Sequence, residues 1–164
     1  MSTGNDLARV LASGSATEQL AAAEQLAHLG EEAQPAAVAL VESLDSEDEA
    51  LRDWIVAALE GLGPPSAKDV AALAKLTTST GIDVAYWATT LLGRLGADAA
   101  PSTGSLTKAL ESHPDLVVRE RAALALGKIG PEAASAKQAL EQAAASADAR
   151  LAKLAGEAIE LIGS

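Results

Sequence analysis

The amino-acid sequence predicts an all-α protein, a right-handed α-solenoid (an α-α superhelix) in which five helical hairpins contribute ten helices. The first observation is composition: 39 of the 164 residues are Ala, 24 are Leu, and none is Phe. Ala and Leu favour helices, and small side chains let helices pack closely. The second is that alternating runs of Val, Ile and Thr, which are typical of strands, do not occur. The third is an internal repeat.

Three columns of residues recur with a period of 33 or 34. An apolar residue followed by Gly occurs at Leu29-Gly30, Leu62-Gly63, Leu95-Gly96, Ile129-Gly130 and Ile162-Gly163. A Ser column comprises Ser13, Ser46, Ser79, Ser112 and Ser146, and a Leu column comprises Leu7, Leu40, Leu73, Leu106 and Leu140. A period of this length is typical of stacked supersecondary units.

Each column has a physical interpretation. A Gly after the last apolar residue of a helical pattern ends a helix, and Pro64 and Pro131 directly after two of these glycines support that interpretation. A Ser ahead of a helical pattern is typical of an N-cap, and we expect capping boxes at Ser46 with Glu49 and at Ser112 with Asp115. We therefore expect first helices near residues 5–12, 34–44, 66–77, 99–111 and 133–145. Second helices are expected near residues 16–29, 47–62, 81–95, 114–129 and 147–162.

The length and composition of the chain predict its domain organisation and its cellular compartment. We expect one domain over residues 1–164, with repeats of about residues 1–30, 31–63, 64–96, 97–130 and 131–164. The chain has no Cys, which excludes disulfides and thiolate chemistry. The N-terminal residues lack the pattern of a secretory signal, and 18 apolar residues never run uninterrupted. We therefore expect a cytoplasmic protein that does not enter a membrane.

The chain is acidic, and its charge is uneven. The net charge is −11, which argues against a general nucleic-acid binder. Residues 1–82 hold 13 acidic and 4 basic side chains (−9), whereas residues 83–164 hold 10 and 8 (−2). The C-terminal half is therefore nearly balanced.

The segment Asp115-Leu-Val-Val-Arg-Glu-Arg-Ala-Ala-Leu-Ala-Leu-Gly-Lys-Ile-Gly130 closely resembles the second helix of a HEAT-like repeat, of the short bacterial kind also seen in phycobilin-lyase-type proteins. Residues 48–63 follow the same frame. Repeat 3 departs from it at Gly81 and Ala85, and repeat 5 at Ala152. The resemblance implies that the second helices line a concave face. It also implies that Arg52 and Arg119 tie neighbouring hairpins together.

Helical periodicity indicates which positions of the second helices face away from the core. These columns contain all three aromatic residues, and exposed Trp and Tyr are typical of binding hot spots. In the alternative, both Trp residues pack between repeats as spacers. Glu120 belongs to the same columns. The predicted partner-binding residues are Trp54, Tyr86, Trp87, Asp53, Asp83, Arg94, Arg121, Lys128 and Lys153.

The hypothesis is a non-enzymatic scaffold that binds a protein or peptide segment. The segment would place an apolar anchor near Trp54 and Trp87, and acidic groups toward the basic second helices of repeats 3–5, where Arg150 also lies. Self-association through the end repeats is a further expectation, because Leu7, Val10, Leu11, Leu154, Leu161 and Ile162 lack an outer neighbour.

Catalytic residues, metal ligands and cofactors are not expected. No phosphate loop, dinucleotide fingerprint or hydrolase triad is present. The two histidines, His28 and His113, do not form the ligand set of HEAT-like di-iron hydroxylases, and we interpret them as a surface residue and a turn residue. A bilin-lyase-type chromophore carrier remains the alternative function. A HEAT-like DNA glycosylase is a second alternative that the negative charge disfavours.

Overall fold

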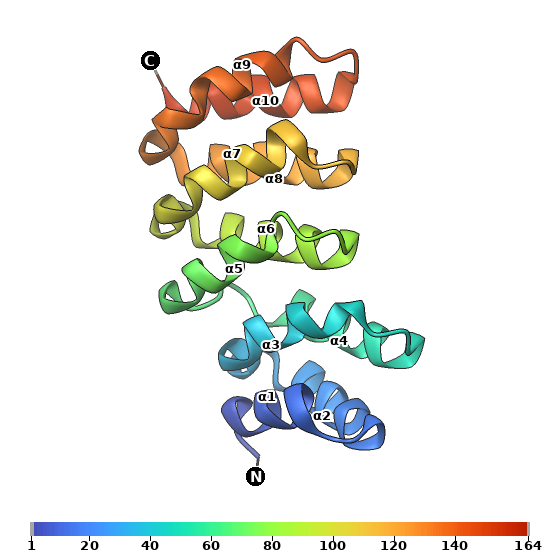
Figure 1. Ribbon diagram of the computed structural model, residues 1–164. Helices are drawn as coiled ribbons and strands as arrows, with labels where there is room; N and C mark the ends of the chain where they lie inside the picture. The colour runs from blue at the N-terminus through green and yellow to red at the C-terminus, as the bar shows by residue number, and fades with distance from the viewer. Residues whose placement is uncertain (1, 164) are drawn as a thin grey trace. The chain divides into compact units, whose positions relative to one another are not determined.

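The computed structural model describes residues 2–163, and over this range the fold is the predicted all-α solenoid of helical hairpins (Figure 1). Ten α-helices and five 3-10 turns account for the regular structure of the described range, and no strand occurs in it. The chain divides into two compact units, residues 1–69 and residues 70–164, here called the N-terminal part and the C-terminal part. The single domain with five repeats stays a prediction.

The N-terminal part holds two hairpins, and its second helices α2 and α4 pack against each other. Its elements are α1 (Gly4–Ser13), α2 (Ala16–Leu29), η1 (Gly30–Ala36), α3 (Ala37–Glu42), η2 (Ser43–Asp45), α4 (Glu49–Gly61) and η3 (Ala67–Asp69).

The C-terminal part holds three hairpins. Its second helices pack in the order α6, α8, α10, and each also packs on the first helix of its own hairpin. The elements are α5 (Val70–Leu76), α6 (Ile82–Leu95), η4 (Gly96–Ser102), α7 (Thr103–Ser112), α8 (Leu116–Ile129), η5 (Gly130–Ala136), α9 (Lys137–Ala144) and α10 (Ala149–Ile162).

The second helices agree with the predicted ranges to within two residues, and so does α1, but the first helices of repeats 2–5 begin three or four residues later than predicted. In repeats 2, 4 and 5 the chain enters the first helix through a 3-10 turn, so that a second helix, the turn and the next first helix join without a loop. Pro35 and Pro101 lie inside two of these turns. Proline has no N–H to donate to the fourth preceding carbonyl, so the regular α-helical ladder starts only after it.

The Gly and Leu columns have the predicted roles. The five glycines of the column are the only residues with positive φ among those described, with φ from 56° at Gly30 to 84° at Gly163. This left-handed conformation ends a helix and favours Gly because it has no Cβ. The Leu column is buried throughout, from 0% exposure at Leu40 to 4% at Leu7.

The N-cap prediction for the Ser column is wrong. The N-caps of α4, α8 and α10 are Asp48, Asp115 and Asp148, whose carboxylates accept from backbone N–H groups of the first turn. Ser46, Ser79 and Ser146 lie two residues earlier, and each hydroxyl accepts from the N–H two residues ahead at 3.1–3.2 Å. Ser residues favour this turn and the N-cap for the same reason, which is why the sequence did not separate them.

In repeat 4 the equivalent position is His113 and not Ser112. Its Nδ1 accepts from the Asp115 N–H at 3.1 Å, as the hydroxyls do in the other repeats. The extra residue of the 34-residue spacing therefore lies between Ser79 and His113.

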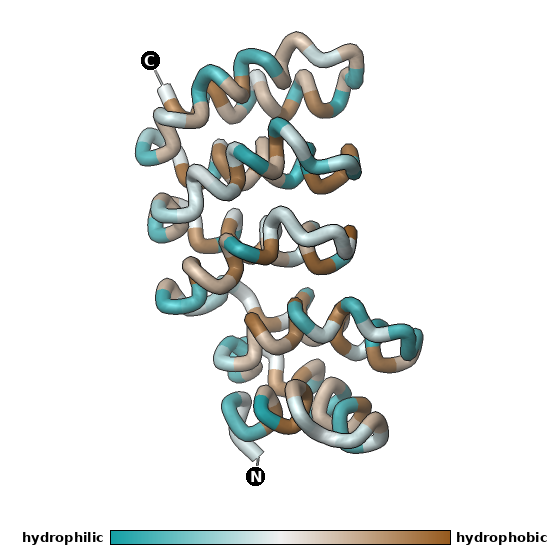
Figure 2. The backbone as a smooth tube through the Cα atoms, viewed as in Figure 1, coloured by the Kyte–Doolittle hydropathy of each residue, from teal (hydrophilic) through white to brown (hydrophobic). Residues whose placement is uncertain are grey.

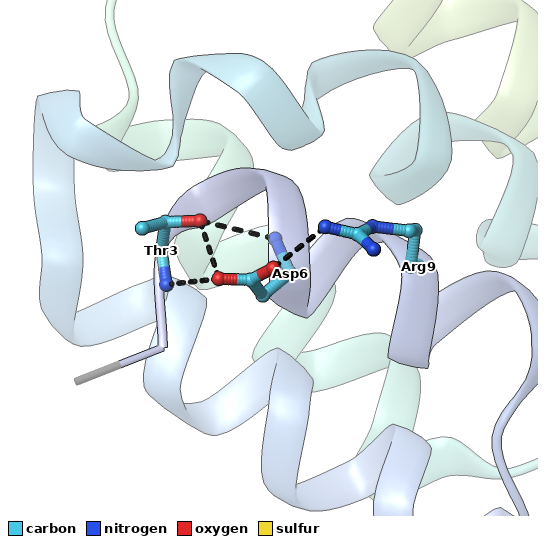
Figure 3. Close-up of polar contacts among 3 residues, drawn as sticks. All are labelled: Thr3, Asp6 and Arg9. Atoms are coloured by element: carbon cyan, nitrogen blue, oxygen red, sulfur yellow. Dashed lines mark hydrogen bonds and ion pairs between the residues drawn. The ribbon is translucent and has the colours of Figure 1, made fainter.

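The two helices of repeat 1, α1 and α2, are capped differently from α4, α8 and α10. At α1 the Asp6 carboxylate accepts from the backbone N–H of Thr3 at 3.1 Å and from its hydroxyl at 2.7 Å, and Arg9 donates to it at 2.7 Å (Figure 3). The Thr3 hydroxyl is the main cause that lowers the pKa of Asp6, followed by the Thr3 backbone bond. Ser15 and Glu18 interact in the same way at α2. Capping boxes therefore occur in repeat 1 and not at the two predicted positions.

Candidate functional site

The outward stripe of the second helices in the C-terminal part carries an excess of positive charge. Ala88, Leu92, Ala122 and Leu126, on the opposite stripe, are 0% exposed, as the periodicity predicted. Lys128, Arg150 and Lys153 are exposed, and Arg94 and Arg121 are partly exposed. We call the surface formed by Arg94, Arg121, Lys128, Arg150 and Lys153 the cationic face. The carboxylates on the same stripes are Asp83, Glu120, Glu157 and Glu160.

Two guanidinium groups of the cationic face lie over aromatic rings of α6. The Arg121 guanidinium carbon, on α8, is 4.7 Å from the centroid of the Tyr86 ring. Arg94 is 5.6 Å from the Trp87 ring centroid, and the rings of Tyr86 and Trp87 meet edge to face at 5.6 Å. Cations are attracted to the faces of aromatic rings, so these contacts hold both arginines close to α6 while leaving them partly exposed.

Trp87 is buried, and the prediction that it faces the surface is wrong. Its exposure is 8%, because the Tyr86 ring and the Arg94 guanidinium lie against it. The alternative interpretation of a packing residue therefore describes Trp87. Tyr86 is half-buried. A partner at this face would meet the edge of Tyr86 and the arginines before it met the indole.

Glu120 is also buried, although its column was predicted to face outward. Its exposure is 6%, and its carboxylate accepts from the Arg150 Nε at 3.1 Å. This ion pair links α8 to α10, which lies in the next repeat. The Arg150 side chain remains 71% exposed, so one edge of its guanidinium faces solvent. By contrast, Lys153 pairs with Glu157 of its own helix at 3.7 Å, and an exposed pair of this kind contributes little to stability.

A small hollow lies between α6 and α8 on the cationic face. The two helices approach closely there, because an added Cβ on Gly93 would lie 3.4 Å from Ala125. Arg121 and Lys128 line the hollow together with Thr89, Thr90, Gly93, Leu124 and Ala125. It therefore places two cations beside threonine and aliphatic side chains.

The N-terminal part carries the other predicted aromatic residue. Trp54, on α4, is half-buried, and its ring centroid lies 5.7 Å from that of His28 on α2. His28 and Asp53 are exposed, as predicted. Trp54 and Asp53 thus form a patch of the N-terminal part, whereas Asp83, Tyr86 and Trp87 belong to the C-terminal part.

Arg52 and Arg119 were predicted to tie neighbouring hairpins together, but their side-chain hydrogen bonds stay within their own repeats. Arg52 Nη1 donates to the Ser46 carbonyl at 2.9 Å, and Arg119 Nε donates to the Leu110 carbonyl at 2.8 Å. Each bond closes the hairpin of its own repeat. Leu110 lies in the last turn of α7, where carbonyls have no intrahelical partner, whereas Ser46 lies in the turn between η2 and α4.

His113 links two repeats, which the sequence interpretation missed. It is 6% exposed, and its Nε2 lies 3.0 Å from the Ser79 carbonyl of the preceding repeat. The carbonyl can only accept, so Nε2 donates, and Nδ1 accepts from the Asp115 N–H. The place of His113 in a column otherwise filled by Ser was the available signal.

The predicted self-association surface is smaller than expected. Leu7, Leu11 and Ile162 are at most 5% exposed, so Val10 at 37% and Leu161 at 59% are the large exposed side chains of that set.

Within residues 2–163 no three His, Asp or Glu side chains are grouped so that they could hold a metal ion. Over the same range, no helix combines the length and the apolar character needed to cross a membrane.

These features define a helical repeat protein of the α-solenoid class with an exposed face on its second helices. A family model of HEAT repeats matches residues 70–160. The match covers more than half of the chain, which therefore belongs to the HEAT-repeat family. The comparison with curated proteins finds no match.

Several solved structures of repeat proteins have the same fold. The crystal structure of an engineered protein has 24% identity and a TM-score of 0.65, over 97% of this chain and 78% of that one. A second engineered protein has 25% identity and a TM-score of 0.63, over 98% of this chain, which spans 48% of it. A designed armadillo repeat protein in complex with the peptide (KR)4 has 18% identity and a TM-score of 0.65, over 96% and 81%.

Proposed function

We propose that this HEAT-repeat protein is a non-enzymatic scaffold whose cationic face binds an acidic segment of a protein or peptide. The observation that carries the proposal is the local charge: five cations and four carboxylates lie on the stripes that form this face, in a chain with a net charge of −11. Of these four carboxylates, Glu120 is buried against Arg150. The solvent-exposed charge of the face is therefore mainly positive, which favours an anionic partner.

The side chains of this face suit carboxylate recognition. Arginine has a planar set of donors that matches a carboxylate, and Arg121 is already positioned by the Tyr86 ring. Pre-positioned side chains lose less conformational entropy on binding. A solenoid related in fold, the designed armadillo repeat protein, forms a complex with the basic peptide (KR)4. The cationic face of this chain is mainly positive, so we infer an acidic ligand for it.

The remaining predicted contacts divide between the two parts. Trp54 and Asp53 offer a separate contact on the N-terminal part. Arg94, Arg121, Lys128 and Lys153 belong to the cationic face, and Tyr86 lies against it under Arg121. Trp87 is buried and packs against Tyr86 and Arg94, so it does not serve as an exposed anchor.

The test measures fluorescence anisotropy of a labelled peptide of alternating Glu and Ser, with the matching Gln and Ser peptide as the neutral reference. The test variant is Arg121→Glu with Lys128→Glu. Its control is Lys75→Glu with Lys108→Glu, which changes the net charge equally on exposed residues of α5 and α7. We expect about tenfold weaker binding of the acidic peptide by the test variant, and at most about twofold weaker binding by the control.

Binding should also weaken as salt is added, because ions screen exposed charges. Equal binding of the acidic and neutral peptides, or equal losses in both double variants, would contradict the proposal. Thermal melting of each variant checks that the fold is kept.

A further inference from the structure

A cluster of large apolar side chains is exposed at the start of α6 and α8. Five large hydrophobic residues are exposed in the described range, and three of them lie in these two first turns: Ile82 at 51%, Leu116 at 37% and Val117 at 47%. The tube is brown, the hydrophobic colour, at the start of both helices in Figure 2. Single exposed apolar residues are normal, but a group on adjacent helices indicates a contact surface. We call these three residues the apolar patch.

The fold alone does not require apolar side chains here. The residues at the same positions after the N-cap are Glu49 and Ala50 in α4, and Ala149 and Arg150 in α10. These helices begin normally without a large apolar residue. The first turn of a helix favours polar and acidic residues, since its N–H groups are free and its dipole is positive. The aliphatic residues of repeats 3 and 4 therefore call for a different explanation.

The apolar patch borders the cationic face. Tyr86 lies one turn after Ile82, and Arg121 lies one turn after Val117, on helices that pack against each other. Tyr86 and Arg121 are in contact at 4.7 Å, so Ile82 and Val117 flank that contact on the same side. Arg150 occupies the position of Val117 in the next repeat, and its side chain is 71% exposed. In α6 the same position is Asp83, which is exposed. The aliphatic side chains thus have Tyr86 and Arg121 one turn further along their helices, and the position of Val117 is a guanidinium in the next repeat and a carboxylate in the preceding one.

We infer that the apolar patch is the anchor site for a large aliphatic or aromatic side chain of the acidic segment that the cationic face binds. This inference rests on the proposed function and names the second chemical feature of the partner. Charge complementarity selects the occupant: Arg121 and Arg150 beside the patch would pair with carboxylates that flank the apolar residue of the ligand. The anchor therefore lies at Ile82 and Val117, and not at Trp54 and Trp87 as the sequence had indicated.

The experiment compares two acidic peptides that differ at one central residue, Leu in the first and Ser in the second. The test protein carries Ile82→Thr with Val117→Thr, which keeps β-branched side chains and removes apolar surface. The control is Val10→Thr on α1, an exposed apolar residue of the N-terminal part with 37% exposure. Wild type and control should bind the Leu peptide about tenfold more tightly than the Ser peptide, and the test variant should bind both alike.

The outcomes separate the anchor from the charge recognition. If wild type binds both acidic peptides equally, the anchor inference fails while the proposed function stands. If the protein binds neither peptide better than a neutral one, the proposed function fails. Gel filtration over a range of concentrations tests whether a second copy of the chain occupies the patch. If wild type forms a dimer and the Thr double variant does not, the patch is a dimer interface and the inference is overturned.

Discussion

The two parts of the chain follow one repeat pattern but differ in charge. Residues 1–69 hold 13 acidic and 3 basic side chains, a balance of −10, whereas residues 70–164 hold 10 and 9, a balance of −1. In the N-terminal part the second helix α4 exposes Asp53 and half-exposes Trp54. The corresponding face of the C-terminal part carries the cationic face and the apolar patch. Stacked hairpins of one period thus present surfaces of different chemistry.

The parts also differ in how adjacent hairpins contact each other. In the C-terminal part three polar contacts cross between repeats: His113 with Ser79, Glu120 with Arg150, and Arg121 with Tyr86. In the N-terminal part the second helices meet near two glycines, and an added Cβ on Gly61 would lie 3.7 Å from the Gly30 Cα. Both parts thus pack second helices closely at glycines, but the contact between side chains differs: the C-terminal part has a hydrogen bond and an ion pair between repeats, whereas α2 and α4 have the ring contact of His28 with Trp54.

The HEAT-repeat match covers residues 70–160, within the part that has the polar links. The period alone did not distinguish the two kinds of interface, because it reports only the length of the hairpin.

The difference in stability can be measured for each part separately, since Trp54 lies in one part and Trp87 in the other. In a Trp54→Phe background fluorescence reports the C-terminal part, and in a Trp87→Phe background it reports the N-terminal part.

The largest expected effect comes from the link between repeats 3 and 4. His113→Ala removes the partner of the Ser79 carbonyl and of the Asp115 N–H, both of which are part-buried, so the C-terminal part should lose about 1–3 kcal/mol of its free energy of unfolding. Denaturant unfolding followed by Trp87 fluorescence measures the loss.

Two controls isolate the link. His113→Ser keeps an acceptor for the Asp115 N–H but cannot reach the Ser79 carbonyl, so its loss should be intermediate. Ser46→Ala removes the equivalent turn bond in the N-terminal part, where no bond to another repeat is made by that hydroxyl, and should cost about 0.5–1 kcal/mol. Similar losses for His113→Ala and Ser46→Ala would show that the link adds nothing to the turn.

The second prediction compares close approaches of second helices in the two parts. A Cβ added at Gly127 in α8 would lie 3.0 Å from the Ala158 Cα of α10, whereas one at Gly61 meets nothing closer than 3.7 Å. Ala favours a helix over Gly by up to about 1 kcal/mol, but overpacking costs about 1–3 kcal/mol. Gly127→Ala should therefore destabilise the C-terminal part by about 1 kcal/mol. Gly61→Ala should stabilise the N-terminal part by about 0.5 kcal/mol, since it lies at a helix end.

The same unfolding measurements decide this comparison. A stabilising Gly127→Ala would mean that α10 moves away from α8 at no cost, and it would remove the packing difference between the two interfaces.

Much of the fold was predictable because it depends on short-range features. The Leu column and the Gly column are fixed by helical periodicity and by the left-handed conformation at a helix end, which the local sequence determines. The starts of the first helices were less predictable, since an Ala-rich stretch containing Pro35 or Pro101 is compatible with a 3-10 turn as well as with an α-helix.

The candidate site was predictable in its charge and not in its details. Periodicity correctly placed Lys128 and Lys153 on an exposed stripe. The burial of Trp87 depends on Tyr86 and Arg94, and the burial of Glu120 on Arg150 in the next repeat. Contacts between side chains on different helices have no signature in a single periodic pattern. The apolar patch was missed because first-turn residues were interpreted only as part of the helix start.

The smallest expected effect concerns the start of α6. Its N-cap is Gly81, which has no side chain to accept from the first turn, whereas α4 begins at Asp48, whose carboxylate accepts from the Leu51 N–H at 3.1 Å. Gly81 has φ −71°, which any L-residue can adopt. Gly81→Asp should therefore stabilise the C-terminal part by about 0.5–1 kcal/mol, through the new cap and a less flexible unfolded chain. Asp48→Gly should destabilise the N-terminal part by a similar amount. Suppose that Asp48→Gly lowers the stability of the N-terminal part, but Gly81→Asp leaves unfolding of the C-terminal part unchanged. The missing side-chain cap of α6 would then not weaken repeat 3. The hydrogen bond from the Gly81 N–H to the Ser79 hydroxyl, at 3.2 Å, would be sufficient to start the helix.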